Sequence, residues 1–238
     1  MPRFFTNLIE GSSALIQGPD ARHLSRVLRI RPGEELTVCD GQGTDYLCRV
    51  LRAEEDMVRL EVLRSQPCET EPRLAITLYQ ALPKGEKLDW ILQKAVELGA
   101  VRIVPVLTRF CVARLSPKEF EKKLPRCERI VLEAAKQCGR GIIPSVERIL
   151  SFEQALDEIS GPAIVCYEGG GAPIRELVRP GEKSLAILIG SEGGFSPEEI
   201  ALCGQAGIPC ASLGKRILRC ETAPIAALAL ALSAAGEL

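Results

Sequence analysis

The chain has 238 residues, which is enough for one large domain or two modest ones. Hydrophobic residues make up 46% and charged residues 26%, close to the average of folded globular proteins, which excludes disordered and fibrous classes. The net charge is −1, and the longest apolar stretch, residues 223–235, is shorter than the roughly 18 to 20 residues that a membrane-spanning helix needs.

Short strands and turns are expected in the first 63 residues. Residues 20–30 predict a short helix, and Pro32 and Gly33 form the centre of a predicted type II turn. Alternating apolar residues then predict strands of a small barrel at 35–40, 46–51 and 58–63. Residues 64–73 contain two prolines and show no periodicity, so they are the expected linker.

Beyond the linker the pattern alternates between strands and helices, which is typical of a mostly parallel sheet with helices on its faces. The expected strands are 74–80, 101–107, 146–150, 163–167, 185–189 and 209–213. The expected helices are 84–98, 117–138 with a kink at Pro125, 152–159, 197–206 and 223–235. Ligands bind such sheets beyond the carboxyl ends of the strands.

Two segments that follow predicted strands suit binding loops. The first, residues 190–199, has three glycines that let the main chain approach a ligand, and Ser196, Pro197 and Glu199 predict a capped helix start. It fits neither the dinucleotide fingerprint nor the P-loop. The second, residues 213–223, places three cations and one carboxylate before an apolar helix, which is costly unless these charges have a task. Together the two loops predict a pocket.

Charge is unevenly distributed along the chain. Residues 82–148 hold 14 Lys and Arg against 8 Asp and Glu, whereas residues 149–212 hold 3 against 9. The first 31 residues add five arginines against two acidic residues. Such asymmetry predicts a surface that binds a polyanion such as RNA, with an uneven solvated surface as the alternative. One face of the predicted 117–138 helix and its end is mostly basic, with Lys118, Lys122, Arg126, Arg129, Glu133, Lys136 and Arg140.

Metal and hydrolytic chemistry have little support. The ten cysteines form no C-x-x-C pair and His23 is the only histidine, so we expect no metal. No export signal is recognisable, so we expect a cytoplasmic protein with reduced, mostly buried cysteines.

The loops LIGSEGGFSPEE (188–199) and LGKRILRCETA (213–223) resemble those of the SPOUT methyltransferases. With LPKGEK (82–87), QKAVELG (93–99) and AAKQCGR (134–140), the chain resembles the ribosomal RNA small subunit methyltransferase E (RsmE) family over nearly its whole length. RFF (3–5) and HLSRVLRIRPGE (23–34) fit the PUA-like barrel of that family. One departure is Ser191, because the family loop usually reads G-P-E-G-G.

The resemblance implies an α/β fold: a PUA-like RNA-binding β-barrel at 1–68, then a SPOUT methyltransferase domain at 73–238 with a parallel sheet and a C-terminal trefoil knot. It implies a homodimer, for which we expect helix 223–235 in the interface, and S-adenosylmethionine as the cofactor. The implied reaction methylates N3 of one uridine in small-subunit (16S) ribosomal RNA, with no metal and no membrane. A ribose 2′-hydroxyl target and a non-catalytic RNA-binding factor of ribosome assembly are the alternatives.

The resemblance also implies roles for individual residues. Arg219 is the candidate cation, Glu221 the candidate catalytic carboxylate and Glu192 the second, although Glu221 could equally serve as a helix cap or an ion-pair partner of Arg219. The implied cofactor-binding residues are Leu188, Gly190, Gly193, Gly194, Leu213, Gly214, Leu218 and Thr222. The expected RNA-binding residues are Arg3, Arg22, His23, Arg26, Arg29, Lys84, Lys87, Lys122, Arg126, Arg129 and Arg140.

Overall fold

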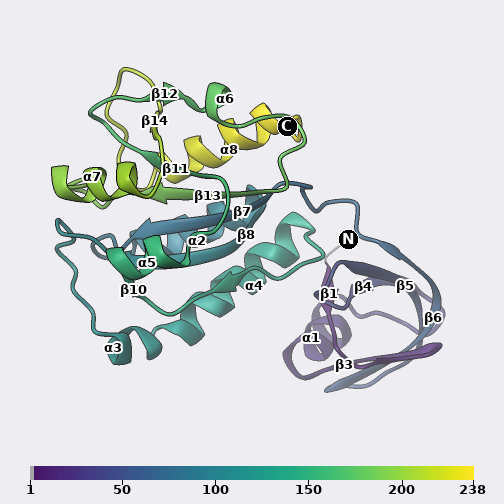
Figure 1. Ribbon diagram of the computed structural model, residues 1–238. Helices are drawn as coiled ribbons and strands as arrows, with labels where there is room; N and C mark the ends of the chain where they lie inside the picture. The colour runs from purple at the N-terminus through teal and green to yellow at the C-terminus, as the bar shows by residue number, and fades with distance from the viewer. Residues whose placement is uncertain (1–2) are drawn as a thin grey trace. The chain divides into compact units, whose positions relative to one another are not determined.

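The computed structural model describes residues 3–238, which divide into two compact units (Figure 1). Residues 3–71 form the first unit together with Ala135–Ile143. Pro72–Ala134 and Pro144–Leu238 form the second. The sequence-based division assigns residues 135–143 to the second domain, whereas in the structure they pack with the first unit.

The first unit is a curled sheet in the order β1-β4-β5-β6-β3-β2 (Figure 1). Thr6 links β3 to β4, because its N–H donates to the carbonyl of Cys39 (3.0 Å) and its hydroxyl to that of Leu15 (2.6 Å). The fully buried Ile16, Leu24 and other apolar side chains fill the inside of the curl. The strands are β1 (Phe4–Phe5), β2 (Ile9–Glu10), β3 (Ser13–Gln17), β4 (Glu35–Cys39), β5 (Thr44–Ala53) and β6 (Met57–Pro67).

The local predictions for this unit hold with two corrections. The single expected helix is a short α-helix, α1 (Gly18–Arg22), followed by a π-helical turn, η1 (His23–Val27). Strand β6 continues to Pro67, into the expected linker. The predicted turn is present: Gly33 has φ +90°, and the N–H of Glu34 donates to the carbonyl of Arg31 (3.1 Å).

The second unit is built on a parallel sheet, as predicted, in the order β10-β8-β7-β13-β11-β14-β12, with β9 beside β8. Sequence patterning did not predict the short β12, and the single strand expected at 146–150 is two short strands, β9 and β10, which pair with different parts of β8. The strands are β7 (Ala75–Ala81), β8 (Ala100–Leu107), β9 (Ser145–Val146), β10 (Leu150–Ser151), β11 (Ala163–Cys166), β12 (Ala172–Pro173), β13 (Ser184–Ile189) and β14 (Cys210–Ser212).

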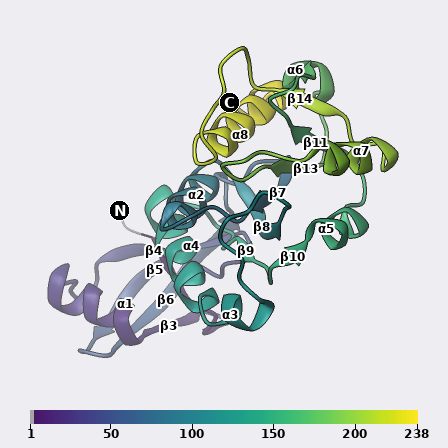
Figure 2. The ribbon, with the colours of Figure 1, turned by 90° about the vertical axis from the view of Figure 1, so that its left-hand side faces the viewer.

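Helices cover both faces of this sheet (Figure 2). Alternate strand residues such as Val104, Val165 and Leu188 form one core with α5 and α7. On the other face α8 packs against α2, β7 and β13, and it also contacts α6. The expected helix 117–138 is two helices whose break, at 122–123, precedes Pro125. The helices are α2 (Lys87–Glu97), α3 (Pro117–Glu121), α4 (Leu124–Cys138), α5 (Phe152–Glu158), α6 (Ile174–Leu177), α7 (Pro197–Gln205) and α8 (Ala223–Ala235).

A buried ion pair holds residues 140–142 within the first unit. The Glu71 carboxylate lies 2.6 Å from the Arg140 guanidinium and accepts the backbone N–H groups of Gly141 (2.7 Å) and Ile142 (2.9 Å). Burial alone would raise the pKa of Glu71, but the hydrogen bonds from Arg140, Ile142 and Gly141 lower it. Because the Arg140 side chain is only 3% exposed, this residue does not fit the RNA-contacting surface predicted for it.

We predict that Glu71→Ala lowers the free energy of unfolding at pH 7 by about 3 kcal/mol, because it leaves the Arg140 charge buried without this partner. The folded-state pKa of Glu71 is depressed, so its contribution is complete above the unfolded-state pKa of about 4.3 and is lost as the pH falls through the folded value. Urea unfolding of wild type and variant should therefore converge in acid. The exposed Glu69→Ala is the control, and an unchanged gap between pH 7 and pH 3 would contradict the assignment.

Candidate functional site

The register of the parallel strands brings three loops to one edge of the sheet. Ile189, the last residue of β13, is paired with Cys166 at the end of β11 and with Gln80 near the end of β7. Cys166 is in turn paired with Ala211 of β14. The segments that follow β11, β13 and β14 therefore leave the sheet side by side, as parallel strands require.

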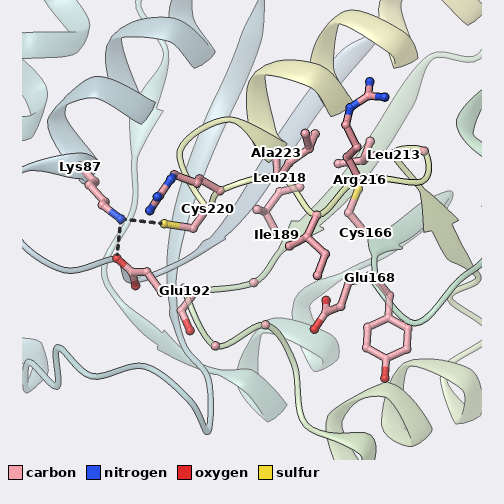
Figure 3. A pocket seen from close by; sticks show the side chains of 18 residues that line it. Lys87, Cys166, Glu168, Ile189, Glu192, Leu213, Arg216, Leu218, Cys220 and Ala223 are labelled. Carbon is pink, nitrogen blue, oxygen red and sulfur yellow. Dashed lines mark hydrogen bonds and ion pairs between the residues drawn. The ribbon is translucent and has the colours of Figure 1, made fainter.

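These three loops surround a cavity of about 370 Å³ (Figure 3). Among the predicted cofactor-binding residues, two do not line it: Leu188 is buried within β13, and Thr222 directly precedes α8. Of the predicted catalytic residues, Glu192 and Arg219 line the cavity and Glu221 lies beside it, bound to the lining residue Lys87. The predicted cofactor residues on the wall are Gly190, Gly193, Gly194, Leu213, Gly214 and Leu218.

The loop after β11 is a wall of the cavity that the sequence analysis missed. Cys166, Tyr167 and Glu168 line the cavity from this side. A side chain at Gly171, whose φ is +152°, would collide with the backbone carbonyl of Cys210. The available signal was three consecutive glycines, 169–171, one residue after a predicted strand, because clustered glycines after a strand also identified residues 190–194.

Close packing explains the glycines of the loop after β13. A Cβ on Gly193 would lie 2.7 Å from the Cβ of Phe110, and Gly194 has φ +68°. The Gly194 N–H donates to the carbonyl of Ser191 (3.0 Å), so a hydrogen bond constrains this turn where the family usually has proline. Ser191 is only 6% exposed and lines the cavity, and its hydroxyl has no partner among residues 3–238.

The predicted capping box at the start of α7 is confirmed and does a second task. The Glu199 carboxylate accepts the N–H of Ser196 (2.8 Å), and the Ser196 hydroxyl accepts that of Glu199 (3.3 Å). The other carboxylate oxygen of Glu199 accepts the N–H of Arg109 (2.8 Å). The glycine loop is thus attached to a helix start that is itself tied to the segment following β8.

Lys87 lies at the cavity, although its predicted role was a general RNA contact. Its ammonium is 3.0 Å from Glu192 of the loop after β13 (Figure 3). It is also 3.2 Å from Glu221 of the loop after β14. It also donates to the Cys220 sulfur at 3.8 Å. Among residues 3–238, the cation paired with Glu221 is Lys87 and not Arg219. The first turn of α2 therefore links the two glycine loops.

This cluster sets the protonation of its members. Hydrogen bonds with Glu192 and Glu221 raise the pKa of Lys87. The hydrogen bond with Cys220, together with Lys87, lowers the pKa of Glu221. Burial alone would raise the pKa of Glu192, but backbone hydrogen bonds and Lys87 lower it. Burial and Glu221 raise the pKa of Cys220 to about 12, so at neutral pH the cluster has one ammonium, two carboxylates and a neutral thiol.

Comparison with known proteins identifies the family. Residues 70–232 match the RNA methyltransferase domain family, and residues 16–63 match the RNA methyltransferase PUA domain family. Ribosomal RNA small subunit methyltransferase E of Bacillus subtilis is 34% identical over 243 residues, covering 96% of this chain and 94% of the relative. The Mycobacterium bovis protein of the same name is 34% identical over 236 residues, covering 96% and 87%. The chain belongs to the ribosomal RNA small subunit methyltransferase E family.

A solved structure agrees over the same length. The crystal structure of ribosomal RNA small subunit methyltransferase E from Neisseria gonorrhoeae, bound to S-adenosyl methionine, is similar with a TM-score of 0.86 and 34% identity. The match covers 98% of this chain and 97% of that chain. Both the curled first unit and the parallel-sheet second unit therefore have counterparts in this family.

In the first unit, the predicted RNA-binding residues differ in their exposure and in whether a carboxylate of the same chain binds them. Arg22 and Arg26 are exposed but paired with Asp56 and Glu55. The Arg3 side chain is only 13% exposed and is paired with Asp45. Arg29 is exposed, and its backbone has a left-handed φ of +52°. His23 is exposed, and its ring centroid lies 6.2 Å from that of Phe4.

In the second unit, Lys84, Lys122 and Arg129 are exposed, and Arg126 is exposed but binds Asp89 at 2.6 Å. At the end of the basic face, Lys136 lies in the first unit and pairs with Asp20 at 2.9 Å. The predicted face is thus exposed at Lys122, before α4, and at Arg129, whereas Arg126 and Lys136 bind acidic partners.

The sequence-based expectations also concern the cysteines, possible metal ligands and apolar helices. None of the ten cysteines, all within residues 3–238, is part of a disulfide, and seven of them are buried. Within residues 3–238 no group of three or more His, Cys, Asp or Glu is arranged to hold a metal ion. No helix in the same range has the length and hydropathy needed to cross a membrane.

We predict that Lys87→Met raises the pKa values of Glu192 and Glu221, because the variant removes the cation that both carboxylates face at 3.0 and 3.2 Å. A carbon-detected NMR titration of the glutamate carboxyl groups measures this directly. Lys84→Met is the matched control, since Lys84 contacts Glu192 through its backbone N–H only. Unchanged titration of both glutamates in Lys87→Met would show that Lys87 does not hold the loops electrostatically.

Proposed function

We propose that this chain methylates small-subunit ribosomal RNA with S-adenosylmethionine bound between its glycine loops. The observation that carries the proposal is the cavity enclosed by the loops after β11, β13 and β14, in a chain that matches a cofactor-bound relative over 98% of its length. Such an enzyme works where the small subunit is made, which supports the cytoplasm as its location.

The walls of the cavity suit an adenosine-containing cofactor. A Cβ on Gly190 would lie 3.0 Å from the backbone of Gly194, so the start and the end of the loop after β13 approach as closely as glycine allows, and both residues line the cavity. The unpartnered Ser191 hydroxyl adds a buried polar group without a protein partner. We propose that the main chain of Gly190, Gly193, Gly194, Leu213, Gly214 and Leu218 holds the cofactor, with Leu188 and Thr222 fixing the ends of the two loops.

The finer proposal is methylation of N3 of one uridine in 16S ribosomal RNA. When bound, the cofactor supplies an electrophilic methyl group. The N3 atom carries a proton at neutral pH, which passes to water as N3 takes up the methyl group, and a cation close to the uracil oxygens stabilises the negative charge that develops as this proton leaves. Arg219 suits this role because it is exposed at the cavity and pairs with no carboxylate among residues 3–238.

The acidic residues suit a positioning role better than that of a general base. A general base works best with a pKa near the operating pH, whereas the pKa values of Glu192 and Glu221 are lowered below the ordinary glutamate value. Both carboxylates also face Lys87. We propose that they hold Lys87, and through it the two loops, in the geometry that Arg219 needs.

We also propose a homodimer and a trefoil knot. Trp90 on α2 is 50% exposed and Leu230 on α8 is 46% exposed, so each of these two neighbouring helices presents a large apolar side chain that a second copy would cover. A molecular mass of 25.8 kDa in light scattering would contradict the dimer.

The trefoil knot is supported by the path of the chain. After β14, which lies beside β11, the chain returns to place α8 against β7 and β13.

We predict that Gly194→Val abolishes cofactor binding and RNA methylation, because a side chain there is strained at φ +68° and displaces Glu168 from the cavity wall. Calorimetry with S-adenosylmethionine and mass spectrometry of 16S ribosomal RNA from a complemented deletion strain measure the two effects. Gly204→Val is the control, since a Cβ at Gly204 meets open space. A methyl group on a ribose would favour the 2′-hydroxyl reaction, and wild type without cofactor binding would favour a non-catalytic assembly factor.

We predict that Arg129→Ala weakens RNA binding and reduces the salt slope of log K by about 0.7 to 0.9, the loss of one phosphate contact. Arg129 is exposed on the basic face of α4. Arg179→Ala is the matched control, because this exposed arginine lies in the acidic stretch 149–212. Cofactor affinity should stay unchanged in both variants. Equal salt slopes for Arg129→Ala and wild type would mean that this face is only solvated.

A further inference from the structure

Glu168 is a charged group of the cavity wall that the residues described so far leave unused. It lies two residues beyond the end of β11 and points toward the glycine loop after β13 (Figure 3). Whereas Glu192 and Glu221 are both paired with Lys87, the Glu168 carboxylate has no hydrogen bond or ion pair among residues 3–238.

The backbone opposite Glu168 is shaped to admit its carboxylate. A Cβ on Gly194 would collide with the Glu168 Oε1, so the carboxylate stands directly over the Gly194 Cα. The Glu168 carboxylate and the Gly194 backbone therefore meet at one point of the cavity. The turn Ser191–Gly194 has no side chain at its last residue, and a free carboxylate occupies the space that a side chain would fill.

We propose that Glu168 accepts hydrogen bonds from the ribose hydroxyls of the adenosine cofactor, an inference that rests on the proposed function. The two oxygens of a carboxylate match the two adjacent O–H donors of a ribose, and hydrogen bonds to a charged acceptor are the strong ones. An acidic residue beyond the end of a parallel strand binds ribose in the same way in dinucleotide folds.

The competing role is a counter-ion for the positively charged sulfonium. Glu168 is exposed, and the attraction between exposed charges is weakened by solvent and salt. A pair of directional hydrogen bonds to a diol depends less on burial. The ribose is therefore the ligand group that this placement favours. Ligands with and without the sulfonium distinguish the two roles.

The test is a calorimetric comparison of wild type, Glu168→Ala and Glu168→Gln with three ligands. S-adenosylmethionine carries the sulfonium, S-adenosylhomocysteine lacks it, and 5′-methylthioadenosine keeps only adenine, ribose and a thioether. We expect Glu168→Ala to weaken all three by the same factor, roughly 10- to 100-fold, the range for hydrogen bonds to a charged group. Glu168→Gln keeps one acceptor oxygen and should recover part of the loss. Glu153→Ala, an exposed glutamate of α5 away from the cavity, is the control and should bind as wild type.

A 2′-deoxy form of 5′-methylthioadenosine closes a double-mutant cycle. Wild type should bind it less tightly than the ribose form, whereas Glu168→Ala should bind both about equally. A loss confined to S-adenosylmethionine would overturn the ribose assignment in favour of the counter-ion, and unchanged affinity for all ligands would overturn any cofactor role of Glu168. Failure of wild type to bind any of the ligands would overturn the proposed function, and this inference with it. Urea unfolding checks that each variant folds.

Discussion

Strand β13 is the constraint on which the rest of the second unit depends. It is paired along its whole length with β7 and over its last four residues with β11, and its five residues after Ser184 are buried. A fully paired central strand cannot slip without moving every side chain to the wrong face of the sheet. Its end at Ile189 therefore fixes where the glycine loop begins, and the register with Cys166 fixes which other loop faces it. The position of the cavity is therefore set by the strand register and not by any single residue.

Electrostatics then divides the charges around the cavity into two groups. Lys87, Glu192 and Glu221 satisfy one another and tie the start of α2 to two loops. Arg219 and Glu168 remain without such partners among residues 3–238, and both border the same space. A site that binds a cofactor and orients a second substrate needs both paired and unpaired charges. The paired charges fix the positions of the loops, and only the unpaired ones are available to contact a ligand. The division follows from the position of one lysine.

Local signals predicted much of this arrangement, and the failures are non-local. Helix α8 has its predicted bounds and α7 begins with its predicted capping box, because both depend on residues that are neighbours in sequence. The two loops were found from glycines after buried strands. Glu168 and the cavity position of Lys87 were missed, since each gains meaning only from loops more than twenty residues away in the chain. The RsmE resemblance, in turn, rested on motifs spread over the chain rather than on any one of them.

Charge counting was the least reliable guide, for a physical reason. The basic face predicted along residues 117–140 treats every lysine and arginine as available, but a cation counts toward an RNA surface only when no carboxylate of the same protein engages it. Arg140 is buried against Glu71, Lys136 faces Asp20, and Arg126 binds Asp89, whereas Lys122 and Arg129 stay exposed. Pairing of this kind cannot be read from composition, because the acidic partners lie between 37 and 116 positions away. The residues that can contact phosphate are thus fewer than the surplus of charge suggests, and in this segment they include Lys122, between α3 and α4, and Arg129 of α4.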